Sequence, residues 1–226
     1  MCDGIKQRKA KVEMSSQNPH FTFNYVQPEE YRFSHDSVFL ARKVFELFTG
    51  NLQDAIALDL CAGCGIVGLD FLYHCKTVGR DLPAHFDFLE VQNTYRKYFE
   101  QNSQRFGDDL PPVNFLNENY EILKSESFQN RYDLILSNPP YFRVNQGILS
   151  PSEFKNRCRF FIDSDFKNLI EAIHNALKPE GSAYILLKDL LHHGVSPLEE
   201  AKKILGEQRT ISIVADIRGT PLAIIE

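Results

Sequence analysis

The residues best suited to chemistry form one short run, Asn138, Pro139, Pro140 and Tyr141, which follows the apolar stretch YDLILS. Prolines have no N–H to donate, so a predicted strand ends here and its tip is stiffened. An exocyclic or amide nitrogen is a poor nucleophile, because its lone pair is delocalised into the adjacent π-system. Preorganised acceptors at the Asn138 side-chain oxygen and the Pro139 carbonyl would restore that lone pair. The run therefore predicts methyl transfer to such a nitrogen, with Tyr141 stacked on a planar acceptor, and a proline-rich turn is the alternative.

A second candidate site is the glycine-containing stretch LDLCAGCGIVG. Gly63 and Gly65 fall between a predicted strand and a predicted helix, where glycine permits a tight turn and close approach of a ligand. Such a loop suits NAD, FAD, a nucleotide or S-adenosylmethionine, and an ordinary tight turn has the same pattern. Cys61 and Cys64 form a CxxC without a second CxxC in the chain. Two small residues in a crowded loop explain them better than a redox or zinc site, so we expect no metal.

Two further predicted strands also end in polar residues. The stretch FDFLE ends at Glu90, whose carboxylate could accept hydrogen bonds from both hydroxyls of a ribose. A surface glutamate at a strand end is the alternative. The next strand is followed by Asn117, Glu118 and Asn119, one of which could hold an adenine amino group. Spacing favours Asn119, although a polar turn would have the same composition.

The elements that must position these residues alternate along the chain. We predict strands at 55–60, 86–90, 113–117, 132–138, 183–188, 210–217 and 221–226. We predict helices at 66–74, 94–106, 164–178 and 197–205, the third capped by Ser164, and one earlier helix capped among Ser34, Asp36 and Ser37. Alternating strands and helices indicate a mostly parallel sheet with helices on both faces, closed by a C-terminal hairpin. In such sheets ligands bind at the carboxyl ends of the strands, where all the candidate residues fall.

The segments outside this alternation are assigned separately. Residues 1–19 are polar and predict a mobile tail, and residues 20–34 predict a small β-hairpin at the start of a single domain that spans 20–226. Residues 142–163 show little regular pattern, and loops of that length are commonly functional. This segment carries Arg143, Lys155, Arg157 and Arg159 against only two acids. It predicts a basic patch for RNA phosphates beside the chemistry, whereas a solvated mobile loop is the alternative.

Composition bounds the possible partners. The 226 residues carry a formal net charge of −5, so the chain as a whole has no attraction for nucleic acid or anionic membranes. No apolar run approaches the ~20 residues of a membrane helix, and the N-terminus lacks a secretory pattern. We therefore expect a cytoplasmic protein without membrane contact. Five cysteines do not suggest a disulfide framework, and a monomer is the default expectation, since nothing in the sequence fixes the oligomeric state.

These motifs together carry a resemblance to a known family. Through YRFSHDSVFLA, LDLCAGCGIVGL, SNPPYF and SIVADIRGTPLAIIE, the chain resembles class I, Rossmann-like, S-adenosylmethionine-dependent methyltransferases with the N–P–P–Y motif. Within that group it is similar to the bacterial tRNA adenine-N6 methyltransferases, which act on the adenine just 3′ of the anticodon in a valine tRNA. The resemblance covers roughly residues 20–226 and implies a seven-stranded sheet whose last strand is antiparallel.

The resemblance also implies roles for particular residues. On the cofactor side it implies Asp59, Gly63, Gly65 and Glu90, with Arg32 and Asp36 bordering cofactor and active site; Cys61, Asn119 and Asn138 are expected there as well. It implies that Asn138 to Tyr141 hold the target amine. Two departures stand out: Cys61 replaces the first glycine of many relatives, and Phe160 and Phe161 occupy the place of their His-Glu pair. The second departure bears on the RNA target more than on the chemistry.

Several functions other than tRNA adenine methylation share parts of this pattern. The N–P–P–Y tip also serves methylation of a glutamine amide in a release factor or ribosomal protein, but such enzymes carry an N-terminal helical domain, for which 19 residues leave no room. A guanine-N2 or DNA-amine acceptor is a further variant of the same chemistry. A non-catalytic binding module would keep the fold without the activity. An NAD-linked oxidoreductase has no use for Asn-Pro-Pro-Tyr.

Overall fold

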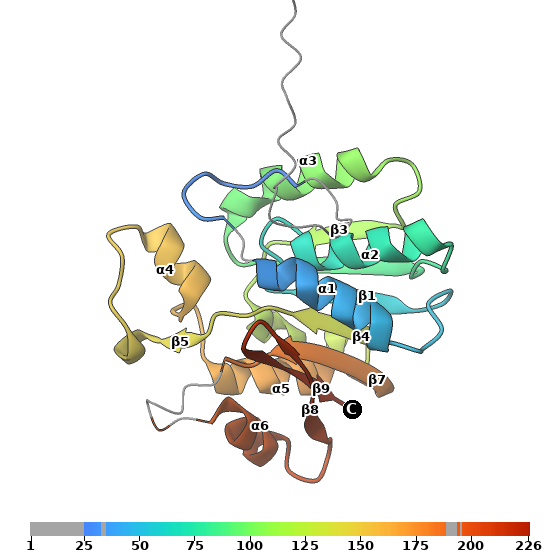
Figure 1. The fold of residues 1–226 in the computed structure, drawn as a ribbon. Coiled ribbons are helices and arrows are strands. Elements are labelled where there is room, and N and C mark those ends of the chain that lie inside the picture. Colours follow the sequence, from blue (N-terminus) through green and yellow to red (C-terminus); the bar gives the residue numbers. More distant parts are fainter. Residues whose placement is uncertain (1–24, 33–34, 189–193, 195) are drawn as a thin grey trace, which may run out of the picture.

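The protein is represented by a computed structural model that describes residues 25–32, 35–188, 194 and 196–226 (Figure 1). The predicted tail at 1–19 lies outside the described residues, as do residues 20–24, 33 and 34 of the predicted hairpin. The described part of that hairpin, 25–32, contains no strand. No helix among the described residues is long and apolar enough to cross a membrane.

Seven strands form one sheet in the order β3-β2-β1-β4-β7-β9-β8. Their bounds are β1 Ile56–Leu60, β2 His85–Leu89, β3 Val113–Leu116, β4 Tyr132–Ser137, β7 Leu177–Leu186, β8 Ile211–Ile217 and β9 Thr220–Ile225. Within this sheet β9 runs opposite to the other six strands and pairs antiparallel with β7 and β8. The predicted α/β fold is therefore confirmed. The carboxyl ends of β1, β2 and β4 lie side by side, because these strands are parallel and paired in register.

Helices cover both faces of the sheet (Figure 1). One face carries α1 His35–Leu47, α2 Ile66–Val78 and α3 Arg96–Phe106, and the other carries α5 Phe166–Ala176 and α6 Pro197–Leu205. Successive residues of a strand point to opposite faces, so β4 sends Leu134 and Leu136 into the first layer and Ile135 into the second. A strand buried on both faces is apolar throughout, which explains why the strands could be recognised from continuous apolar runs.

Two predicted boundaries around α5 are wrong. The helix is capped by Asp165, whose side chain accepts a hydrogen bond from the N–H of Asn168 at 2.8 Å, and not by Ser164. It ends at Ala176, and β7 begins at once with Leu177, earlier than the predicted strand at 183–188. Pro179 and Gly181 lie inside β7, where the pairing with β4 shifts register, so they mark an irregular strand and not a helix end.

The segment 142–163 is ordered, contrary to the absence of pattern in its sequence. It contains β5 Phe142–Arg143, the 3₁₀ helix η4 Val144–Gln146, α4 Glu153–Arg159 and β6 Phe160–Phe161, and we call it the arm. Strands β5 and β6 pair with each other, and α4 projects from the side of the body in Figure 1. Local side-chain bonds stabilise the arm: Asn156 bonds the backbone N–H and C=O of Ser150 at 2.7 and 2.8 Å. Such bonds leave no periodic signature in a sequence.

Candidate active site

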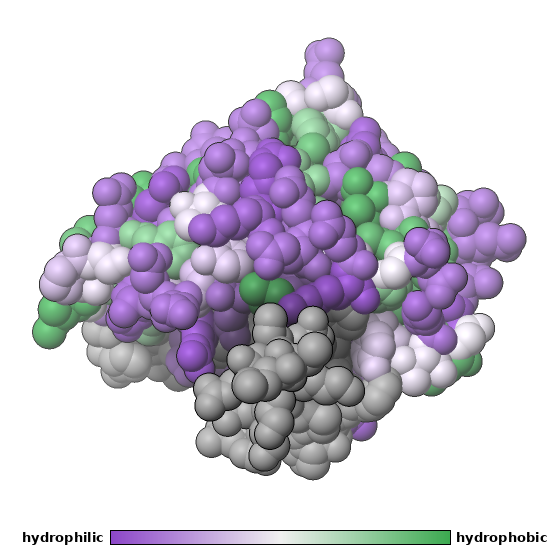
Figure 2. Space-filling view, turned by 90° about the horizontal axis from the view of Figure 1, so that it is seen from above, coloured by the Kyte–Doolittle hydropathy of each residue, from purple (hydrophilic) through white to green (hydrophobic). Residues whose placement is uncertain are grey.

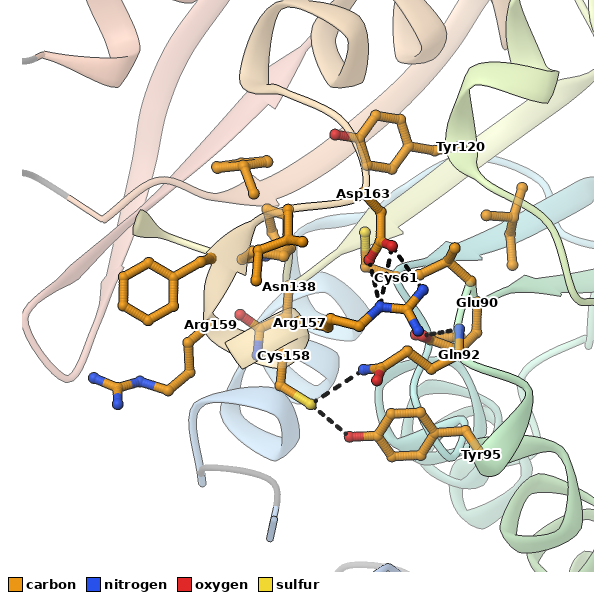
Figure 3. A pocket seen from close by; sticks show the side chains of 18 of the residues that line it. Cys61, Glu90, Gln92, Tyr95, Tyr120, Asn138, Arg157, Cys158, Arg159 and Asp163 are labelled. Atoms are coloured by element: carbon orange, nitrogen blue, oxygen red, sulfur yellow. Dashed lines mark hydrogen bonds and ion pairs between the residues drawn. The ribbon is translucent and has the colours of Figure 1, made fainter. Parts of the chain in front are cut away.

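A cavity of about 210 Å³ opens at the carboxyl ends of β1, β2 and β4 (Figure 3). The predicted site residues that line it are Cys61, Glu90, Asn119, Asn138, Pro139, Pro140, Tyr141, Arg157 and Arg159. Those that do not line it are Arg32, Asp36, Asp59, Gly63, Gly65, Arg143 and Lys155. Within the described chain, no group of three or more His, Cys, Asp or Glu side chains could hold a metal ion.

The backbone of the glycine loop turns through the left-handed region three times. Gly63 and Gly65 have φ values of 54° and 82°, which glycine adopts without steric cost. Cys61 has φ 62° and is not a glycine, so it carries strain of roughly 1–2 kcal/mol. This explains why a glycine suits the same place in relatives. A side chain at Gly65 would also meet Phe99 at 2.8 Å, so this position has no room for one.

Two buried carboxylates accept hydrogen bonds from backbone N–H groups in this loop and just after it. One oxygen of Asp59 accepts the N–H of Gly68 at 2.8 Å, and the other has no hydrogen-bond partner among the described residues. Glu90 accepts the N–H of Gly63 at 2.9 Å through one oxygen and that of Gln92 at 2.8 Å through the other. Asp59 does not line the cavity, whereas Glu90 does. The structure thus separates a carboxylate that binds the backbone of α2 from one that can reach a ligand.

Burial changes the protonation of both carboxylates. It raises the pKa of Asp59 to about 8, and that of Glu90 to about 7, although the two backbone N–H groups on Glu90 act in the opposite direction. Near neutral pH Glu90 is therefore a mixture of the protonated acid and the carboxylate. A ligand that donates hydrogen bonds to it will favour the carboxylate.

The tip of β4 is held by hydrogen bonds on both sides of the Asn138 amide. Its Nδ2 donates to Ser37 Oγ at 2.9 Å, and its Oδ1 accepts from the Tyr141 hydroxyl at 2.7 Å. Burial raises the pKa of Tyr141 well above its usual value, so the phenol stays protonated and remains a donor. The main-chain N–H of Tyr141 also donates to the Arg159 carbonyl at 3.1 Å, which ties the tip to the arm.

The three residues after β3 differ in what their side chains can still bind. Asn117 does not line the cavity, and its Nδ2 donates to the Glu90 carbonyl at 2.9 Å. Asn119 lines the cavity, but its oxygen caps the 3₁₀ helix η2 (Tyr120–Lys124) and its Nδ2 donates to the Asp163 carbonyl at 2.8 Å. Glu118 lines the cavity, is exposed, and forms no hydrogen bond through its carboxylate with the described residues. The geometry therefore leaves Glu118 and Asn119 as candidates for an adenine.

Arg157 points into the cavity and not outward as a surface cation would. Its guanidinium bonds the Asp163 carboxylate at 2.6 and 3.0 Å and lies beside Glu90 (Figure 3). The pair is about three-quarters buried, with side-chain exposures of 26% and 23%. This position suits contact with a ligand in the cavity better than contact with a phosphate on the molecular surface.

The other cations of the arm differ in their availability. Arg143 is ion-paired with Glu200 of α6, which fastens the arm to the body. Arg159 is exposed and stacks over the Phe142 ring at 5.8 Å. Lys155 and Arg159 form no ion pair with any residue that the structure describes. These two side chains remain available to an anionic partner.

Sequence reasoning missed several residues that shape the cavity. Cys158 of α4 lies 3.2 Å from the Tyr95 hydroxyl and 3.4 Å from Gln92 Nε2, which closes the arm against the 3₁₀ helix η1 (Asn93–Tyr95) (Figure 3). Ser37, interpreted as a possible helix cap, lies inside α1 and bonds Asn138. These contacts join residues that are 63 and 101 positions apart in the sequence, so no local sequence pattern predicts them.

Part of this chain is similar in sequence to known methyltransferases. No protein-family model matches the chain. The tRNA1(Val) (adenine(37)-N6)-methyltransferase of Dyadobacter fermentans is 43% identical over 129 residues, 57% of this chain and 49% of that protein. The type II methyltransferase M.AccI of Acinetobacter calcoaceticus is 27% identical over 176 residues, 74% of this chain and 30% of that protein. The chain thus spans about half the length, or less, of these curated relatives.

A solved structure extends the comparison to the whole fold. A ribosomal protein L11 methylase from Lactobacillus delbrueckii subsp. bulgaricus superposes with a TM-score of 0.54 at 15% identity, covering 84% of this chain and 79% of that one. The predicted resemblance to tRNA adenine-N6 methyltransferases is confirmed over the aligned part of the chain. The chain has the fold of the class I, Rossmann-like methyltransferases.

Proposed function

We propose that this protein is an S-adenosylmethionine-dependent N-methyltransferase whose acceptor is the N6 amine of an adenine in tRNA. The observation that carries the proposal is that the Asn138–Tyr141 tip and Glu90 face one cavity. The names of several curated relatives, tRNA1(Val) (adenine(37)-N6)-methyltransferase, support the choice of acceptor. The alternative amine acceptors remain outcomes of the experiment below.

The cofactor half of the cavity fits an adenosine. Glu90 would accept hydrogen bonds from the ribose hydroxyls, since its buried carboxylate gains donors there. Leu89 and Tyr120 supply apolar surface for the purine, and Glu118 or Asn119 would accept from its amino group. When bound, S-adenosylmethionine supplies an electrophilic methyl group.

The acceptor half of the cavity fits a flat base. Aromatic side chains line it: Tyr31, Tyr141, Phe142, Phe160 and Phe161. Such walls stack on a base that has been extruded from its loop. The Asn138 oxygen and the Pro139 carbonyl would accept the two hydrogens of the amine and direct its lone pair toward the methyl group. No strong base is needed before transfer, because the methylated cation loses its proton readily.

Cofactor affinity is expected to increase with pH up to about 7 and then to level off. The pKa of Glu90 is raised to about 7, and the ribose hydroxyls require the ionised form. Below that pH each binding event must release a proton, so the dissociation constant should increase about tenfold per pH unit. Calorimetric titration with S-adenosylhomocysteine from pH 5.5 to 8.5 measures this. Glu90→Gln should bind weakly with little pH dependence in this range, and an unchanged slope in that variant would assign the titration to another group.

Contact with RNA is expected to depend on Lys155 and Arg159 of the arm. Replacing both with alanine should weaken tRNA binding and reduce the slope of log affinity against log salt by about 1 to 2 units. The fold should persist, since neither side chain makes an ion pair within the described chain. The face seen in Figure 2, from above relative to Figure 1, is largely hydrophilic, with hydrophobic groups in small separate spots.

A matched control removes two cations at the opposite end of the molecule. Lys76 and Arg105 lie in the last turns of α2 and α3, whereas the cavity borders the first turns of these helices. The double variant Lys76→Ala with Arg105→Ala should keep the wild-type salt slope. Equal slopes for both double variants and the wild type would exclude the arm from the RNA interface.

The function itself is tested with labelled S-adenosylmethionine and three acceptor pools: total tRNA, total protein and genomic DNA. Label in tRNA that digests to N6-methyladenosine would establish the proposal. Label in protein alone would indicate a glutamine amide, and label in DNA alone would follow the similarity to a type II methyltransferase. Cofactor binding without transfer to any pool would refute the proposed activity on these acceptors.

A further inference from the structure

Among the residues that the structure describes, the Asn138 side chain forms hydrogen bonds with Ser37 and Tyr141. Ser37 lies in the first turn of α1, and its side chain is buried, with the residue 6% exposed. The bond from Asn138 Nδ2 to Ser37 Oγ is 2.9 Å long and joins α1 to the tip of β4 across 101 residues of sequence. It is thus a tertiary contact at the atom group on which the proposed chemistry depends.

The orientation of this amide decides whether the site can work. An asparagine amide offers two acceptor lone pairs on its oxygen and two donors on its nitrogen. The terminal torsion of asparagine is broad and roughly two-fold, so rotation by half a turn exchanges these groups. If Nδ2 faced the acceptor half of the cavity, its hydrogens would oppose those of the target amine. Transfer therefore requires that Oδ1, and not Nδ2, face the substrate.

The Tyr141 hydroxyl occupies the place that the target amine would take beside Asn138 Oδ1. It donates to Asn138 Oδ1 at 2.7 Å, where the N–H of the target amine would have to donate. Burial keeps this phenol protonated, so its O–H donates the hydrogen bond that an N–H of the target amine would donate. When the amine takes this place as donor, the hydrogen bond to Ser37 still holds the other end of the Asn138 amide.

We propose that Ser37 is a positioning residue for the transfer step: its hydroxyl oxygen, 2.9 Å from Nδ2, anchors the Asn138 amide at the tip of β4 when Tyr141 gives way to the substrate. This role rests on the proposed function and adds a residue to it. Ser37 acts through Asn138, so it should affect turnover and not cofactor affinity. Its effect should also vanish when the Asn138 side chain is absent.

The test is a double-mutant cycle on the full chain. Ser37→Ala should lower kcat about ten- to a hundredfold, while the dissociation constant for S-adenosylhomocysteine and the melting temperature stay close to wild type. In the Asn138→Ala background, adding Ser37→Ala should change the single-turnover rate by less than about twofold. Alanine is a good helix former, so the Ser37→Ala chain should fold.

A control removes another buried serine hydroxyl from the same region. Ser137 precedes the tip of β4, is fully buried, and donates to the Leu60 carbonyl at 2.9 Å without contacting the amide. Ser137→Ala should reduce stability more than turnover. A Ser37→Ala enzyme with wild-type kcat, or one that loses the same factor with and without the Asn138 side chain, would overturn the proposal.

Failure of the proposed function gives a different pattern in the same experiment. If the wild type labels protein or DNA instead of tRNA, the acceptor assigned above is wrong, and the cycle on Ser37 is measured with that other acceptor, since the geometry at Asn138 is unchanged. If the wild type transfers label to none of them, both the proposed function and the role of Ser37 are refuted.

Discussion

Asn138→Ala is expected to lower kcat roughly 10²- to 10³-fold, which is the loss typical for removal of one preorganised group that acts in the transition state. The reason is geometric. Asn138 Oδ1 lies at the carboxyl end of β4 and faces the acceptor half of the cavity, and the two following prolines hold it without an entropic cost during reaction. Glu90 and the glycine loop, which would hold the cofactor, make no hydrogen bond to this side chain.

The measurement separates turnover from binding. Single-turnover transfer from labelled S-adenosylmethionine reports the chemical step, and calorimetry reports cofactor affinity, which should change by less than about threefold. Asn114→Ala is a suitable control, because Asn114 also extends from the sheet but bonds Asp87, away from the cavity. If Asn138→Ala turned over at a near-normal rate, its side chain would have no role in activating the amine.

Asn138, Glu90 and the glycine loop were predictable as a set because each follows its own strand directly. An apolar run that stops at a polar or glycine residue is a local signal, and the parallel pairing of β1 with β2 and β4 then brings the three ends together. If the strands are parallel, the residues that follow them lie at the same edge of the sheet. This single assumption was therefore enough to place the candidate residues together. The structure bears that assumption out.

Arg157 shows where this reasoning ends. From its neighbours in sequence it resembles Lys155 and Arg159, as one cation among several on a loop. In the structure it turns inward, pairs with Asp163 and lies beside Glu90, because α4 folds back over the cavity. Whether a charged side chain of a short helix faces solvent or a cavity depends on the angle at which that helix docks, and composition does not encode the angle.

Phe160 and Phe161 have a structural role that their sequence context did not predict. As departures from a His-Glu pair they raised a question about the RNA target. In the structure Phe160 is 1% exposed, and its ring lies 5.7 Å from that of Phe142, so it belongs to the core of the arm. Phe161, its neighbour on β6, lines the cavity as well and packs against Phe166. Both aromatic residues thus pack within the arm or against it and also line the cavity, a combination that sequence comparison alone could not assign.

Glu90→Ala is expected to raise the dissociation constant of the cofactor by about a hundredfold or more, because hydrogen bonds to a charged group contribute about 1.5–3 kcal/mol each and a ribose would make two. Glu118→Ala is the matched control, since Glu118 also lines the cavity but is exposed, and its carboxylate bonds none of the described residues. It should weaken binding by less than about tenfold. Calorimetric titration of both variants at pH 8 compares them, and equal losses would remove the ribose role from Glu90.

The thermal stability of the protein without cofactor should respond differently to Glu90→Ala. The raised pKa of Glu90 means that its charge is unfavourable in the folded protein above about pH 7, so removing the carboxylate relieves that cost. The change also leaves the N–H groups of Gly63 and Gln92 without their acceptor, which costs about 1–3 kcal/mol each unless water replaces it. These effects oppose one another, so melting temperature at pH 8 should move much less than cofactor affinity. Below about pH 4.5, where Glu90 is protonated in the folded and the unfolded protein alike, the relief disappears and the variant should be the less stable of the two. A residue retained for ligand binding should show this sign, whereas a purely structural carboxylate should destabilise the protein more at high pH when removed.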